Sequence, residues 1–248
     1  MPRLGRGGYT GSMVRGPTDP TILRVAQREI PLVVSRNSRA RRITLRLDGL
    51  SGDVRLVLPK RMALREGLDF ATQKADWLLA QLDALPARVP FADGAVIPLL
   101  GRDHVIRHVA GARRGVWRHD GEILVSGFVE HLPRRVTDFL KAEARAAIAP
   151  LAHAKAAQID RQVTRLTIRH MTSRWGSCGS DGALCFCWRL VLAPLPVFDY
   201  IVAHEIAHLR YMSHGPRFWK LVARLTPEMN GARRWLKRDG DTLLAYGS

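Results

Sequence analysis

Residues 198–219, FDYIVAHEIAHLRYMSHGPRFW, constrain the fold more than any other part of the chain. Apolar residues recur there at i, i+3, i+4, i+8 and i+11, a pattern that predicts a helix with one buried stripe. That stripe is formed by Phe198, Ile201, Val202, Ile206 and Leu209. The same helix carries His204, Glu205 and His208, which need bonding partners if they are even partly buried. We therefore expect the chain to fold so that one partner satisfies several of these groups.

The segment His204-Glu205-Ile206-Ala207-His208 has the form H-E-x-x-H. Four residues advance a helix by about 400°, so the two histidines lie on one face, a turn apart, and can share one tetrahedral metal ion. Glu205 lies beside them, where it can take a proton from a water molecule instead of serving as a ligand. The alternative is a pair of histidines at the edge of the core without a metal, and the spacing favours the metal.

His214 is the candidate for a third ligand. The bridge LRYMS separates it from His208, and Gly215-Pro216 forces the chain to change direction just after it. The alternative is a histidine in the capping region of the next helix. Three protein ligands leave a fourth position for water, which is typical of catalytic zinc sites, and three imidazoles favour Zn²⁺.

This arrangement predicts a zinc-dependent hydrolase, most simply a peptidase. Zinc would make its bound water more acidic, and Glu205 would accept the proton as the water attacks a carbonyl group, then pass it to the leaving amine. A zinc hydrolase of non-peptide amides would use the same residues and stays an alternative. Four side chains are candidates for a second donor to the oxyanion: Tyr200, Tyr211, Arg174 and Arg189.

The remaining sequence predicts an α+β fold in three parts. Residues 1–20 read as a disordered basic tail, residues 21–130 as a β-rich N-terminal subdomain with one inserted helix, and residues 131–248 as a zincin-like α+β catalytic domain. The predicted elements are a hairpin over 41–59, a helix over 64–85, strands at 95–100, 104–109, 115–118 and 123–126, a long helix over 133–159 around Pro150, a strand at 164–170, a hairpin of 173–178 with 183–192, and helices from 194 to 211, from 216 and after 227.

The charge balance favours polyanionic partners. Lys and Arg number 39 against 22 Asp and Glu, a formal net charge of +17. Such an excess attracts nucleic acid, acidic membrane surfaces or acidic proteins. The positive residues are spread along the chain without a nucleic-acid recognition motif, so any nucleic-acid binding is expected to be non-specific. The alternative function is a basic nucleic-acid-associated protein whose zinc site is structural or acts only on DNA-bound proteins.

The cysteines favour a reducing compartment. Cys178, Cys185 and Cys187 are an odd number in a long chain, which is not a disulfide framework, and we expect a cytoplasmic protein. They lack C-x-x-C spacing, so packing is a better interpretation than a second metal site. No run of eighteen apolar residues occurs, and no membrane span is expected. The sequence does not indicate an oligomeric state.

Three segments, TSRWGSC, CFCWRLVLAP and DYIVAHEIAHLRYMSHGPRFW, resemble the YgjP-like metallopeptidase domain family, zincins related to SprT-type proteases. The resemblance covers roughly residues 36–235. It implies a bacterial-type cytoplasmic protein with a zincin core and a β-rich N-terminal part, with His204, His208 and His214 as metal ligands and Glu205 as catalytic acid–base. Metzincins share the ligand spacing, but this chain has Tyr211 where they have glycine. The relation to SprT-like, DNA-associated proteases makes the net charge of +17 more suggestive of nucleic-acid binding, but only by analogy.

Overall fold

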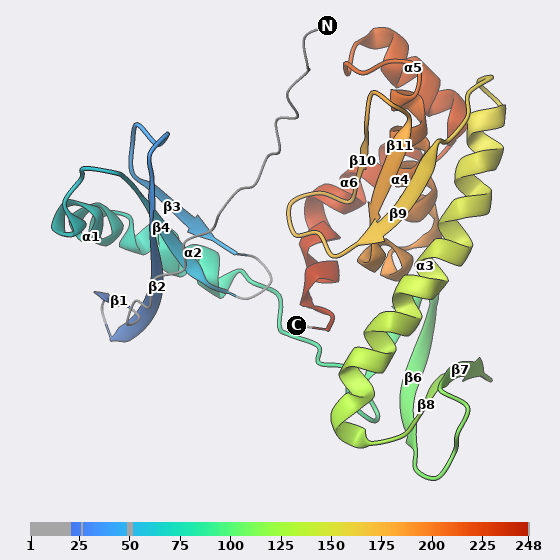
Figure 1. The fold of residues 1–248 in the computed structure, drawn as a ribbon, viewed down its shortest axis with the longest axis horizontal. Helices are drawn as coiled ribbons and strands as arrows, with labels where there is room; N and C mark the ends of the chain where they lie inside the picture. Colours follow the sequence, from blue (N-terminus) through green and yellow to red (C-terminus); the bar gives the residue numbers. More distant parts are fainter. Residues whose placement is uncertain (1–20, 26, 49–51, 248) are drawn as a thin grey trace, which may run out of the picture. The chain divides into compact units, whose positions relative to one another are not determined.

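The computed structural model describes residues 21–25, 27–48 and 52–247, so the expected basic tail over 1–20 lies outside the described residues (Figure 1). Helices and mixed sheets occur together, and the predicted α+β class is confirmed. The chain divides into two compact units. The first contains residues 1–47 and 53–80, and the second contains residues 48–52 and 81–248. Each unit is described by itself.

The first unit is a four-stranded sheet with two helices. Its strands are β1 (Thr21–Val25), β2 (Arg28–Asn37), β3 (Thr44–Leu47) and β4 (Val54–Pro59), in the order β1-β2-β4-β3. The pair β2–β4 is parallel and the other two pairs are antiparallel. Helices α1 (Leu64–Gln73) and α2 (Ala75–Asp83) follow. A Cβ on Gly67 would lie 2.5 Å from the Leu58 Cδ2 atom, so the glycine lets α1 approach β4 closely.

The predicted hairpin over 41–59 is confirmed as β3 and β4. The predicted single helix over 64–85 is wrong: the chain forms two helices, because it leaves the helical conformation at Lys74. The Lys74 amide donates to the carbonyls of Phe70 and Ala71, which tightens and ends the last turn of α1. Strands β1 and β2 were not predicted.

The second unit contains two further sheets. One holds β5 (Val96–Leu99), β6 (Arg102–Val109), β7 (Val116–His119) and β8 (Glu122–Ser126), in the order β5-β6-β8-β7. The other holds β9 (Arg165–Arg169), β10 (Gly176–Cys178) and β11 (Ala183–Cys187), in the order β10-β11-β9. The pairs β6–β8 and β11–β9 are parallel. The four short strands predicted between 95 and 126 are confirmed as β5 to β8.

Four helices complete this unit: α3 (Leu132–Ala157), α4 (Leu195–His208), α5 (Pro216–Leu225) and α6 (Met229–Asp239). The long helix α3 continues through Pro150 and runs beside strands of both sheets (Figure 1). It buries Val136, Leu140, Ala144 and Ile148 completely, at the spacing that predicted it. None of the described helices is long and apolar enough to cross a bilayer.

Three boundaries differ from the sequence-based expectation. The strand predicted over 183–192 ends at Cys187, and residues Trp188–Leu192 form a 3₁₀-helix packed against α3. The helix predicted to residue 211 ends at His208. The expected division between 130 and 131 differs from the units, because the sheet β5-β6-β8-β7 contacts α3 and belongs to the second unit.

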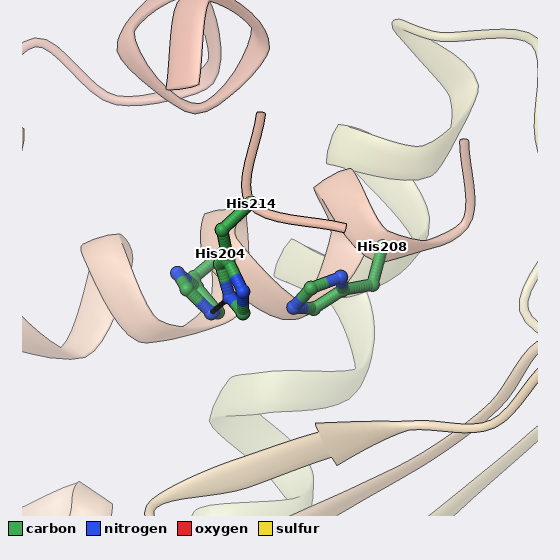
Figure 2. Close-up of side chains that lie close together, drawn as sticks. All are labelled: His204, His208 and His214. Carbon is green, nitrogen blue, oxygen red and sulfur yellow. Dashed lines mark hydrogen bonds between the residues drawn. The ribbon is translucent and has the colours of Figure 1, made fainter. Parts of the chain in front are cut away.

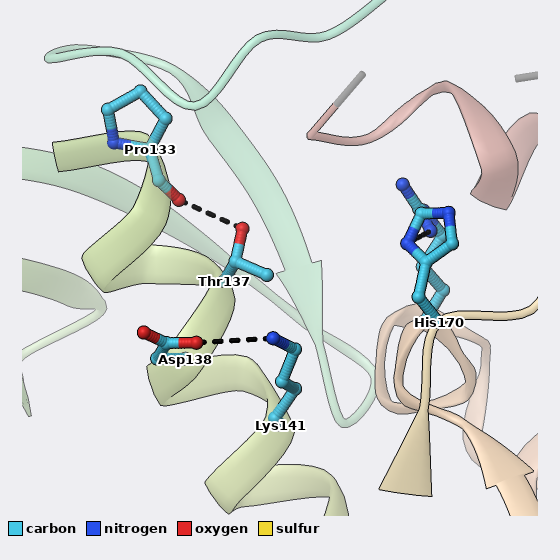
Figure 3. Close-up of polar contacts among 6 residues, drawn as sticks. Pro133, Thr137, Asp138, Lys141 and His170 are labelled. Atoms are coloured by element: carbon cyan, nitrogen blue, oxygen red, sulfur yellow. Dashed lines mark hydrogen bonds and ion pairs between the residues drawn. The ribbon is translucent and has the colours of Figure 1, made fainter. Parts of the chain in front are cut away.

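Two lysines of α3 form ion pairs that differ sharply in burial. On the exposed side, Lys141 contacts Asp138 at 3.2 Å, and the Thr137 hydroxyl donates to the Pro133 carbonyl (Figure 3). One end of the helix carries Lys155, whose side chain is only 7% exposed. Its ammonium lies 2.8 Å from the Asp199 carboxylate on α4 and donates to the Leu225 carbonyl of α5 at 2.7 Å. Lys155 therefore links three helices through one buried charge.

Replacing Lys155 by alanine is expected to lower the free energy of unfolding by about 3 kcal/mol, because it leaves Asp199 and a buried carbonyl without their partner. Urea unfolding would measure the change. The matched control is Lys141→Ala, where an exposed pair is lost and the change is expected to stay below about 0.5 kcal/mol. Equal losses for the two variants would contradict a stabilising role for the buried pair.

Candidate metal centre

Helix α4 is buried on nearly every side. It starts after Pro194, and among its fourteen residues nine are buried: Val197, Phe198, Tyr200, Ile201, Val202, Ala203, Glu205, Ile206 and Ala207. His204 and His208 are half-buried, and their rings face the segment after α4 that carries His214 (Figure 2). The helix therefore presents two imidazoles on one side and keeps a carboxyl group inside the protein.

The structure brings His204, His208 and His214 together (Figure 2). One ligand atom from each ring lies within 4.8 Å of the other two. The Nε2 atoms of His204 and His214 are 3.2 Å apart. Ligand atoms around tetrahedral zinc, with bonds of about 2.0–2.1 Å, are separated by about 3.3–3.4 Å. The donor set and its spacing thus fit a zinc ion.

The protonation of the rings also fits metal binding. The His208 Nδ1 atom lies 3.0 Å from the Tyr211 carbonyl oxygen, so this nitrogen carries the proton and leaves Nε2 as the free donor. Burial lowers the pKa of His204 to about 4, with a further contribution from its histidine neighbours. Burial also lowers the pKa of His208. Both imidazoles are therefore neutral at pH 7, the form that binds a metal.

Helix α5 supplies an aromatic wall behind the three imidazoles. The Phe218 ring is fully buried, and its centroid lies 5.0, 4.5 and 4.7 Å from those of His204, His208 and His214. The Trp219 ring lies 5.6 Å from His214 at an interplanar angle of 31°. The Arg233 guanidinium of α6 covers the same indole at 4.4 Å. His214 is exposed and belongs to a loop, so these stacked groups hold its ring in place.

Glu205 lies against the edge strand β10. Its residue exposure is 6%, and a Cβ on Gly176 would lie 2.6 Å from its Cγ and 2.7 Å from its Oε1. The backbone of β10 therefore runs directly beside this side chain. Burial raises the pKa of Glu205 to about 7, and the positive charge of Arg174 acts in the opposite direction. A carboxyl group with a pKa near 7 exchanges protons readily at neutral pH.

The candidate oxyanion donors differ in their surroundings. Tyr200 is buried, with its ring 5.9 Å from that of His204, and the charge of Arg174 acts on Glu205. Arg189 is 1% exposed and already bonds the Tyr246 carbonyl and His170. Arg189 is therefore already bonded elsewhere, whereas Tyr200 and Arg174 lie near the site. Tyr211, the fourth candidate, is half-buried, and its carbonyl is bonded to His208.

The three cysteines are free thiols, as the packing interpretation expects. Burial, followed by the charges of Glu205 and Asp181, raises the pKa of Cys178 to about 11, so this thiol stays protonated at pH 7. In the described part of the chain, no cysteine belongs to a cluster of three ligating side chains. A protonated thiol is a poor metal ligand, and the imidazoles remain the candidate donors.

Sequence reasoning missed the groups that support the site. Gly176 belongs to the WGSC segment, and Phe218 and Trp219 end the stretch that carries the histidines, but neither pattern shows which side chains meet. Arg233 follows in the next helix without any motif. Their contacts with Glu205 and His214 are set by tertiary packing.

A helix carrying two convergent imidazoles and a buried carboxyl group, with a third imidazole from the following loop, is an arrangement used by metal-dependent hydrolases. The chain belongs to the YgjP-like metallopeptidase domain family, whose model matches residues 41–239. This family implies a metal cofactor and a peptide or protein substrate. No curated protein and no solved structure matches the chain.

Replacing Gly176 by alanine is expected to lower kcat by more than about ten-fold while metal content and fold stay unchanged. The added methyl group would displace the Glu205 carboxyl group, which is the flexible partner in this contact, and if Glu205 is the catalytic acid–base its displacement lowers the rate steeply. Kinetics and metal analysis of the purified variant would measure both. Gly111→Ala is the control, because its Cβ would meet nothing within 4 Å although its φ of +85° carries the usual strain. Normal kcat in Gly176→Ala would contradict this role.

Replacing Trp219 by alanine is expected to weaken metal affinity about ten-fold, because the ring of His214 loses its support. Competition with a chromogenic chelator would measure the affinity, and Trp219→Phe should retain most of it. The control is Trp117→Ala, which removes another indole stacked on an arginine, Arg114. An equal effect of the two alanine variants would contradict a specific role of Trp219.

Proposed function

We propose that the protein is a zinc-dependent metallopeptidase in which His204, His208 and His214 hold the ion and Glu205 is the catalytic acid–base. The proposal is carried by one observation: three imidazoles have ligand atoms within 4.8 Å of one another, and the helix that carries two of them also carries a buried carboxyl group. Membership of a metallopeptidase domain family supports it.

When bound, zinc would supply a Lewis acid that increases the acidity of water and polarises a carbonyl group. Glu205 would take a proton from the attacking water and deliver it to the departing amine. The buried residues of α4 and the backbone of β10 at Gly176 keep bulk water away from this carboxyl group. Tyr200 or Arg174 would donate to the oxygen on which charge develops.

The cysteines bear on the compartment in which the protein works. Three free thiols favour a reducing compartment, and we propose a cytoplasmic location. A peptide or protein is the proposed substrate. A zinc hydrolase of small amides would use the same residues. Activity measured against both peptides and small amides would distinguish it from a peptidase.

A second candidate function is a basic nucleic-acid-associated protein. A hollow of about 390 Å³ beside the metal centre supports it, because four of its six lining residues are cationic and none is acidic. These residues are Arg210, Tyr211, Arg217, Lys220, Leu221 and Arg224. Since the hollow adjoins the loop that carries His214, a bound polyanion would lie near the site. In that function zinc would be structural or would act only on DNA-bound proteins.

Replacing Glu205 by glutamine is expected to lower peptidase activity by about 10²–10⁴-fold while one zinc ion stays bound, because the amide cannot accept the proton. Cleavage of a peptide library, with metal analysis of the same preparation, would measure both. His208→Ala is the companion variant and should lose the metal itself. Full peptidase activity in zinc-loaded Glu205→Gln would rule out the proposed mechanism. Equal zinc content in the two variants would rule out the proposed ligands.

A further inference from the structure

The first unit contains an open groove beside its edge strand β3. This hollow of about 820 Å³ is lined by residues before and within β3, by the turn before α1 and by residues of α1 and α2. We call it the β3 groove. A separate hollow of about 670 Å³ lies on the opposite face of the sheet, where Thr44, Arg46 and Val57 point away from the helices. All of these residues belong to the first unit, so the groove does not depend on the metal centre.

The floor of the β3 groove is aromatic and apolar. Phe70 of α1 and Trp77 of α2 both line it, together with Ile43, Leu45 and Met62. Trp77 is 46% exposed. An indole this open in a cavity offers a flat face on which a planar ligand can stack.

The rim of the β3 groove is cationic. Its three charged residues are Arg41, Arg42 and Lys74, and no acidic residue lines the groove. Within the described ranges, none of these three side chains forms an ion pair with a carboxylate. The fold thus brings together several positive charges without neutralising them, which raises the local affinity for a polyanion.

We propose that the β3 groove binds single-stranded nucleic acid, with bases stacked on Trp77 and Phe70 and phosphates on the arginines and Lys74. Stacking faces are accessible only in unpaired bases, so a duplex would not use the floor. An acidic peptide would use the rim but gain little from the indole face. The volume of about 820 Å³ and two aromatic rings in the lining suit a strand of several nucleotides better than a single nucleotide.

Binding of the full-length protein to a fluorescein-labelled oligothymidylate of about twelve nucleotides would test the proposal, a length within the usual site size for stacking grooves. Fluorescence anisotropy at increasing salt should show binding that weakens steeply with salt. Trp77→Ala should weaken binding about ten-fold or more, and Trp77→Phe should largely restore it because a stacking ring returns. Thermal unfolding of each variant confirms that it is folded.

The role of the rim has its own control. Arg41→Ala with Arg42→Ala should reduce the slope of log affinity against log salt by about 1.4, since each lost phosphate contact lowers the slope on a single strand by about 0.7. Arg113→Ala with Arg134→Ala makes the same change in net charge at exposed positions of the second unit. This control pair should leave the slope nearly unchanged.

Three outcomes would overturn the proposal: no binding of the oligonucleotide at low salt, an equal loss of affinity in the two double variants, or equal binding by wild-type protein and Trp77→Ala. Polyglutamate that competes as well as the oligonucleotide would assign the groove to an acidic polypeptide instead. Peptidase activity on a short peptide should be the same in Trp77→Ala and wild-type protein. The peptidase proposal can therefore fail or hold separately from this one.

Discussion

The burial of polar groups inside helix α4 is the constraint on which the rest of the structure depends. The helix is surrounded by apolar residues, yet it carries Glu205, His204 and His208. A buried polar group without a partner costs several kcal/mol in folding, and the Nδ1 atom of His204 is buried without a hydrogen-bond partner among the described residues. The Tyr211 carbonyl accepts a hydrogen bond from the His208 ring, and the loop after α4 brings His214 to the other two imidazoles. The return of the chain after α4 thus places a third imidazole beside the two on the helix.

Three different kinds of contact hold α4 in position. A buried ion pair through Lys155 connects it to α3 and α5, the ring of Phe218 packs on its imidazoles, and the bare backbone of Gly176 lies beside Glu205. Interiors packed this closely transmit small displacements instead of absorbing them. The positions of the candidate catalytic groups are therefore set by residues on three other elements, α3, α5 and β10, none of which carries a candidate catalytic side chain of its own.

Local patterns predicted more of this protein than long-range ones could. The helical period and the H-E-x-x-H spacing involve residues that are close in sequence, so α4 and the convergence of its two histidines could be predicted from the sequence. The pairing of Lys155 with Asp199 and the approach of Gly176 to Glu205 join distant segments and leave no local signal. Strand β2 was missed because Pro31 interrupts a short apolar run and argues against an interior strand, although β2 lies between β1 and β4.

The two units use tryptophan and arginine in opposite ways. In the second unit, Arg233 already covers Trp219, so charge and ring satisfy each other and the pair serves to hold His214. In the first unit, Trp77 is open on one face, and Arg41 and Arg42 near it have no carboxylate partner among the described residues. A cation that the fold has already paired adds little to recognition, whereas an unpaired one beside an open ring can bind a ligand. The net charge of +17 therefore matters less for partner choice than which arginines the fold leaves unpaired.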